Sequence, residues 1–110
     1  MDDEIKILQT QLSLLKEISV EKIDMMNRLT SLLQSPQPKE ADEIAQRAIM
    51  EARAIDYEKG EAVALLNAGI NASALRKFSA ASDFYKRALK FLKQKPMKHK
   101  SQTFSLNWAT

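Results

Sequence analysis

The sequence contains no cysteine. This absence excludes three kinds of feature together: a disulfide framework, a zinc site built on thiolates, and a cysteine nucleophile. A reducing compartment is compatible with such a composition. The fold must therefore depend on a hydrophobic core and not on covalent cross-links.

Glycine and proline are also scarce, at 2 and 3 among 110 residues, so the chain has few of the residues from which sheet proteins build their turns. Alanine, leucine, lysine, glutamate and glutamine are plentiful, and all of them favour helix. With 45% hydrophobic residues, the chain is long enough for one compact domain and too short for two. We expect a single all-α domain over residues 1–110.

Long apolar runs are missing as well. None approaches the roughly 18 residues that a membrane span requires. The start, Met1-Asp2-Asp3-Glu4, is acidic, whereas a signal peptide begins with basic residues. We expect a cytoplasmic protein with no membrane contact.

The groups that catalysis needs are sparse. His99 is the only histidine, and it lies between two lysines in a stretch that we expect to be a solvated connector. The carboxylates at 2–4 and 40–43 fit helix N-termini, where negative charge is favourable. Neither a glycine-rich phosphate loop nor a metal-spaced cluster of histidines and carboxylates is present. We expect no enzyme activity, no cofactor and no metal site.

Apolar residues recur at helical spacing in five segments. The expected helices span residues 3–18, residues 20 to about 34 with Ser19 as N-cap, residues 39–56, residues 61–75, and a fifth helix that follows residue 79 and is closed by Pro96. Turns are expected at residues 35–38, at Lys59-Gly60 and at residues 76–79. Residues 97–101 would form a basic connector, and residues 103–110 the start of a sixth helix.

The chain also repeats itself. Shifting it by 40 residues places Glu21 on Glu61, Asn27 on Asn67, Ala41 on Ala81, Arg47 on Arg87 and Ala48 on Ala88 without a gap. A second shift places Asn67 on Asn107. These matches fall at equivalent points of two helix–turn–helix units, which indicates a helical repeat. The alternative is an ordinary helical bundle whose helices share an amphipathic pattern.

The second unit resembles the tetratricopeptide repeat family. Its first helix carries Leu65, Asn67, Ala68 and Gly69, and its second helix carries Ala81, Tyr85 and Ala88, with Phe78 near the turn. The usual turn glycine and the proline that closes the second helix are absent, which agrees with a period longer than the usual 34 residues. Similar long repeats occur in bacterial histidine kinases and transcription regulators.

The resemblance implies antiparallel hairpins stacked as a right-handed superhelix. The expected parts are an N-terminal packing helix over residues 3–18, a first repeat over 20–56, a second repeat over 60–95, and the start of a third repeat or a capping helix over 101–110. First helices line the concave face of such arrays, and this face is the usual ligand site. The resemblance therefore implies a partner-binding set of Ile23, Met26, Asn27, Thr30, Val63, Leu66, Asn67, Ile70, Ser73 and Asn107, continued by Thr103 and Thr110.

Two expectations concern the ligand. Side-chain amides at 27, 67 and 107 form a ladder suited to the backbone of an extended peptide, although the same amides can also bond within the repeat. The family members that hold carboxylate-terminated chaperone peptides need basic residues on the inner face. This chain has Ile23, Val63 and Thr103 there, so that ligand class is excluded.

The function expected from these features is a protein-interaction or scaffold module within a larger regulatory protein. The alternative is a homo-oligomerisation module, with Phe104, Leu106 and Trp108 as an exposed edge through which the chain dimerises. A less favoured alternative is nucleic-acid binding by the basic stretch 86–100, since clustered lysines suffice for non-specific contact with phosphates.

Overall fold

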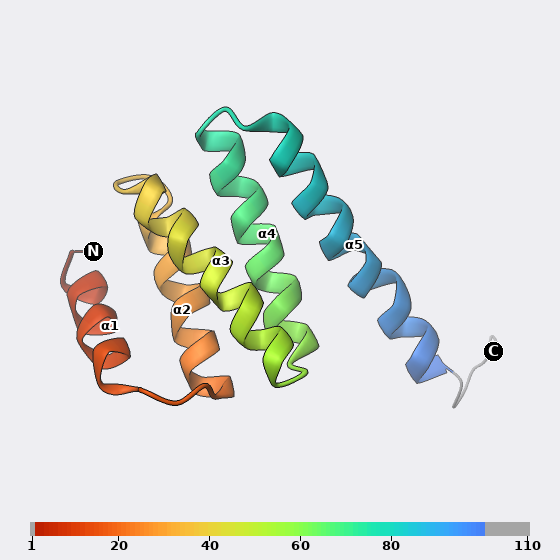
Figure 1. The fold of residues 1–110 in the computed structure, drawn as a ribbon, viewed down its shortest axis with the longest axis horizontal. Coiled ribbons are helices and arrows are strands. Elements are labelled where there is room, and N and C mark those ends of the chain that lie inside the picture. Colours follow the sequence, from red (N-terminus) through yellow and green to blue (C-terminus); the bar gives the residue numbers. More distant parts are fainter. Residues whose placement is uncertain (1, 101–110) are drawn as a thin grey trace.

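A computed structural model describes the backbone of residues 2–100 and the side chains of residues 3–91. Within this range the chain is all-helical, as expected. Its five helices are α1 (Asp2–Leu14), α2 (Val20–Leu33), α3 (Pro38–Ala54), α4 (Glu58–Ala74) and α5 (Phe78–Lys100). Consecutive helices from α2 onward run in opposite directions, so α2 and α4 share one direction (Figure 1).

The helix ends follow from local sequence. Ser19 accepts a hydrogen bond from the backbone N–H of Lys22 at 3.1 Å, which caps α2 as expected. Pro38 at the first position of α3 has no N–H, and this loss costs nothing because an N–H at that position has no partner within the helix. These two signals set the entries of the first hairpin.

The turns after α3 and α4 have the same construction. Asp56 and Arg76 adopt left-handed backbone conformations, with φ of 57° and 66°. The next residue in each turn donates its N–H to a carbonyl five residues back: Tyr57 to Ala52 at 2.8 Å, and Lys77 to Ala72 at 2.7 Å. This pattern closes a helix without glycine.

Equal helix lengths produce the 40-residue period. α3 and α4 contain 17 residues each, and each is followed by a three-residue turn. For these two helices, one helix plus its turn takes 20 residues, so α5 begins 40 residues after α3. The period found in the sequence has a direct structural basis.

Three expected boundaries were wrong. α1 ends at Leu14 and not at residue 18. The turn expected at Lys59-Gly60 lies at residues 55–57, and Gly60 lies inside α4. A Cβ atom on Gly60 would lie 2.9 Å from Cγ2 of Ile23 and 2.4 Å from Cδ2 of Tyr57, so this glycine permits close helix approach and not a turn.

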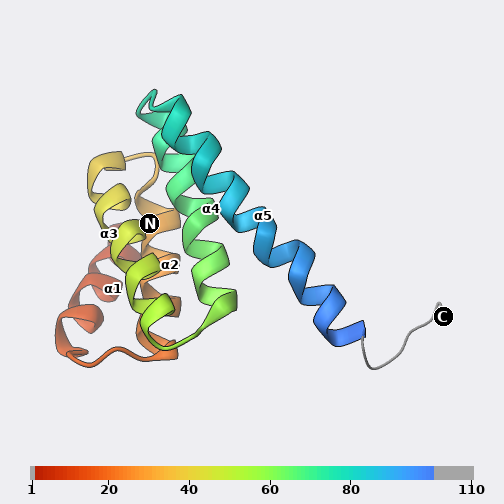
Figure 2. The ribbon, with the colours of Figure 1, turned by 45° about the vertical axis from the view of Figure 1, so that its right-hand side comes forward.

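The third misplaced boundary concerns α5. This helix continues through Pro96 to Lys100, where the sequence predicted an end at Pro96 and a connector from residue 97. A proline removes one backbone hydrogen bond and can kink a helix without ending it. Both views show the last turns of α5 leading away from the other helices (Figures 1 and 2).

The core is built largely from small side chains. Four alanines of α3 and three of α4 are almost completely buried: Ala41, Ala45, Ala48, Ala52, Ala64, Ala68 and Ala72. Larger side chains, chiefly Met26, Ile49 and Leu65, join them where α2, α3 and α4 meet. Alanine at these contacts allows close packing of neighbouring helices. No helix of the described part of the chain is long and apolar enough to cross a membrane.

Candidate interaction surface

Apolar side chains are exposed together along α4 and α5. On α4 they recur at helical spacing as Val63, Leu66 and Ile70, and on α5 they are Phe78, Tyr85 and Leu89. A hollow of about 370 Å³ lies between Ser73 on α4 and the α5 residues Phe78, Ala81, Ser82, Tyr85, Lys86 and Leu89. We call the set Val63, Leu66, Ile70, Ser73, Phe78, Tyr85 and Leu89 the α4–α5 face.

The same repeat positions in the first helix pair are buried. Thr30 is 0% exposed, whereas Ile70, 40 residues later, is 42% exposed. Ile23 and Met26 are likewise buried, whereas Val63 and Leu66 are exposed. The difference also holds on the second helix of each pair, where Ala45 is 0% exposed and Tyr85 is 38% exposed.

The cause of this difference is α4 itself, which packs against both α2 and α3. Gly60 of α4 lies against Ile23. The Asn67 side chain donates to the backbone carbonyl of Asn27 at 3.3 Å. Within the described residues, α4 and α5 have no following helix in the corresponding position, so the equivalent side chains remain in contact with solvent.

This comparison corrects part of the predicted site. Ile23, Met26 and Thr30 were expected on a concave binding surface, but they are core residues packed beneath later helices. The positions chosen by resemblance are those at which one hairpin packs on the next. Among the predicted residues that the structure describes, only Val63, Leu66, Ile70 and Ser73 in the second unit are open to solvent.

The asparagine ladder connects helices in the described structure. Asn27 donates to the backbone carbonyl of Gly60 at 3.2 Å, and Asn67 donates to that of Asn27. The Gln34 amide donates to Oδ1 of Asn67 at 3.3 Å. Both asparagines are buried, so their donors hold α2 against α4 and do not face a peptide. Asn107 and the expected oligomer edge, Phe104, Leu106 and Trp108, lie outside the described residues, as do Thr103 and Thr110.

Sequence reasoning missed the α5 half of the face. Tyr85 and Leu89 were assigned to the apolar stripe of the fifth helix without the inference that they would be exposed. The missed signal was a change of residue size under the 40-residue shift. Leu29 and Ala45 become Gly69 and Tyr85, so the large side chain moves from the first helix of the pair to the second. The Tyr85 ring lies against Gly69, where a Cβ atom would be only 2.6 Å from Cε1.

Positive charge borders the α4–α5 face. Lys59 precedes the stripe on α4, Lys86 lines the hollow, and both are exposed. The α4 sequence from residue 62 to 74 contains no charged residue. On α5, Asp83 is paired with Arg87 at 3.8 Å, and the Arg87 guanidinium lies 5.7 Å from the centre of the Phe84 ring. The border of the face is therefore mainly basic.

Polar side chains gather on α2, away from the α4–α5 face. The outer side of α2 presents exposed Glu21, Asp24, Arg28 and Ser31. Arg28 forms an ion pair with Glu4 at 2.8 Å, and the Tyr57 hydroxyl donates to Asp24 at 2.8 Å. This second bond raises the pKa of Tyr57 above its usual value. This side of α2 is thus polar, unlike the α4–α5 face, although α1 beside it exposes Ile7 and Leu14.

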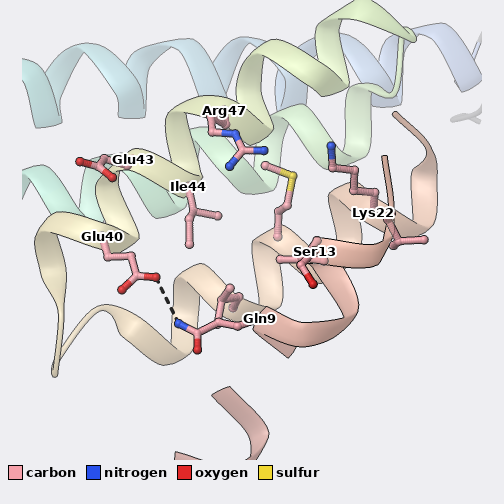
Figure 3. A pocket seen from close by; sticks show the side chains of 11 residues that line it. Gln9, Ser13, Lys22, Glu40, Glu43, Ile44 and Arg47 are labelled. Carbon is pink, nitrogen blue, oxygen red and sulfur yellow. Dashed lines mark hydrogen bonds between the residues drawn. The ribbon is translucent and has the colours of Figure 1, made fainter. Parts of the chain in front are cut away.

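A second hollow, of about 370 Å³, lies between α1, α2 and α3 (Figure 3). Gln9 donates to Glu40 across it at 3.2 Å, as the dashed line in Figure 3 marks. Lys22 at its edge pairs with Glu51 at 3.2 Å, and Arg47 lies 3.8 Å from the same carboxylate. These polar groups already bond to one another, so the hollow is a weaker candidate than the α4–α5 face.

Comparison of the chain with family models, curated proteins and solved structures finds no match. The assignment of a function therefore depends on the geometry of the described residues.

Proposed function

We propose that the chain is a protein-interaction module of the tetratricopeptide type, with its hairpins α2–α3 and α4–α5 stacked as the first turns of a right-handed helical array. The support for this arrangement is the 40-residue period, the matched turns at Asp56 and Arg76, and the hydrogen bond from Asn67 to the carbonyl 40 residues before it. In this proposal the module acts in the cytoplasm as part of a regulatory protein.

The partner protein is proposed to bind at the α4–α5 face. One observation carries this proposal: side chains that are buried in the first helix pair have exposed apolar counterparts in the second. Exposed apolar side chains that lie together on a protein surface mark interaction sites more often than scattered ones do. Each large side chain that becomes fully buried on binding contributes about 1.5–3 kcal/mol.

The competing proposal is that the face binds a second copy of the chain. Isologous pairing would place two faces with the same basic border against each other, and like charges oppose such contact. A foreign partner with negative charge has no such penalty. The basic border therefore favours hetero-association over self-association.

The test compares two surface variants of the immobilised full chain. Ile70→Asp places a charge in the middle of the α4–α5 face, and Ile7→Asp places one at an exposed apolar site on α1, far from that face. Both variants should keep the circular dichroism spectrum of the parent. When a cell lysate is applied, we expect proteins that bind to the parent and to Ile7→Asp but not to Ile70→Asp. Equal retention by all three chains would refute the proposed site.

A further inference from the structure

The contacts of α4 with α2 and α3 indicate which kind of helix binds to a helix pair of this type. Gly60 allows close approach to Ile23, and Asn67 supplies an amide donor to α2. Glu61 supplies an acid: its carboxylate lies 2.9 Å from the Arg53 guanidinium of α3, with the Glu61 side chain only 9% exposed. A partly buried ion pair of this kind is geometrically specific.

The α4–α5 face repeats the surface on which α4 lies. Val63, Leu66, Asn67 and Ile70 stand where Ile23, Met26, Asn27 and Thr30 contact the later helices, and Leu89 stands where Ile49 does. The residue 40 positions after Arg53 is Lys93, so the sequence again supplies a cation at that repeat position on α5. The four positions on the first helix thus keep an asparagine among mainly apolar neighbours, and the sequence keeps a basic residue at the position of Arg53 and Lys93.

Three positions of the face change strongly under the 40-residue shift: Ser73 replaces Leu33, Phe78 replaces Pro38, and Tyr85 is the bulkiest newcomer on α5. It replaces Ala45, but its ring lies over Gly69 of its own hairpin, whose counterpart in the first pair is Leu29. The bulk of the tyrosine thus fills space left by the glycine. The surface left for an incoming helix keeps its outline, with a half-exposed aromatic ring as an added contact.

We infer that the α4–α5 face binds one α-helix of a partner protein, docked parallel to α4 in the position that α4 takes on α2 and α3. This helix carries small residues at its points of closest approach and an acidic residue in its first turn. The inference rests on the proposed function and specifies the partner as an amphipathic, acidic helix. The later segment of this chain does not supply that acid, because Ser101 stands 40 residues after Glu61 and is preceded by Lys98 and Lys100.

The probe for this inference is α4 itself, prepared as a separate peptide. It is a synthetic peptide with the sequence of residues 58–74, held helical by a hydrocarbon staple joining positions 63 and 70, which point away from α2 and α3 in the folded chain. Circular dichroism establishes its helicity before use. A matched probe carries Glu61→Lys, which reverses the charge of the residue that pairs with Arg53.

The measurement is a titration of isotope-labelled full chain followed by NMR. We expect saturable shifts confined to residues around Val63, Leu66, Ile70, Tyr85 and Leu89, abolished by Ile70→Asp and unchanged by Ile7→Asp. The Glu61→Lys probe should bind about tenfold more weakly, since tenfold corresponds to about 1.4 kcal/mol for the lost ion pair. The affinity of the acidic probe should fall as salt is raised.

Several results would overturn the inference. These are no shifts with a probe of established helicity, equal affinity of the two probes, or shifts at Ile23 and Thr30, which would mean that the probe replaces α4 itself. Shifts of the face residues on dilution of the chain alone would assign the face to a second copy. Shifts of the same residues on truncation at residue 94 would assign it to the later part of this chain. If the probe fails while Ile70→Asp still abolishes partner retention, only the inference fails and the proposed function stands.

Discussion

Gly69 and Tyr85 provide a quantitative test of the repeat. In a helix interior, alanine is normally more stable than glycine by about 1 kcal/mol. At Gly69, however, the new Cβ atom would lie 2.6 Å from Cε1 and 2.9 Å from Cδ1 of the Tyr85 ring. Overpacking of this kind costs about 1–3 kcal/mol. We expect Gly69→Ala to leave the free energy of unfolding unchanged or to lower it by up to about 2 kcal/mol.

Removing the ring should reverse that result. In a Tyr85→Ala background the three ring atoms nearest to the added methyl are gone, so Gly69→Ala should stabilise the chain by about 1 kcal/mol. The two substitutions are thus coupled by about 1–3 kcal/mol. The further variant Gly69→Leu with Tyr85→Ala recreates the Leu29 and Ala45 pair of the first unit, and it should be more stable than Tyr85→Ala alone.

The assay is urea unfolding followed by circular dichroism, analysed as a double-mutant cycle. Gly60→Ala is the matched control, because its added methyl would meet Tyr57 and Ile23 and should destabilise the chain equally with or without Tyr85. Additive free energies for the Gly69 and Tyr85 substitutions, within about 0.5 kcal/mol, would refute the assigned contact.

Three further predictions test other contacts. Asn67→Ala removes the bond to the Asn27 carbonyl and should lower the free energy of unfolding by about 1–2 kcal/mol. Asn71→Ala should lower it less, because the buried amide of Asn71 bonds to no group of the described protein. Equal losses in urea unfolding would contradict this prediction. Asp56→Gly relieves a left-handed backbone, φ 57°, and should raise the urea midpoint by an amount equivalent to roughly 1 kcal/mol; a lowered midpoint would exclude the assigned turn. The bond to Asp24 raises the pKa of Tyr57, so its stabilising effect is present below the usual pKa of about 10 and is lost as pH rises through the folded value. Asp24→Ala should therefore lower that pKa, measured by absorbance in a chain whose other tyrosine is phenylalanine, and an unchanged titration would show that the bond does not form.

Much of the fold was accessible from the sequence because the signals are local. Ser19 marks a helix start through its own hydrogen-bonding chemistry, and the helical spacing of apolar residues identified five helices. The turn at residues 55–57 was misplaced because it contains no glycine, and its left-handed residue is Asp56. A left-handed aspartate gives a weaker sequence signal than the glycine at position 60, which serves helix packing.

The candidate site was predicted less well, for a geometric reason. Periodicity identifies which residues share a helix side, but not which neighbouring helix lies over that side. Thr30 and Ile70 occupy the same repeat position, and only the presence of α4 over the first of them separates core from surface. The Asn67 bond to α2 was likewise undetermined, because an amide on a helix can bond a ligand or a neighbouring carbonyl equally well.

One repeat position, that of Thr30 and Ile70, is closed in the first helix pair and open in the second. Because the natural chain has no cysteine, single-cysteine variants report this position without background. We predict that the thiol of Ile70→Cys reacts with a thiol reagent roughly a hundredfold faster than that of Thr30→Cys, which must wait for local opening of the fold. Similar labelling rates at the two positions in the folded chain would contradict the account.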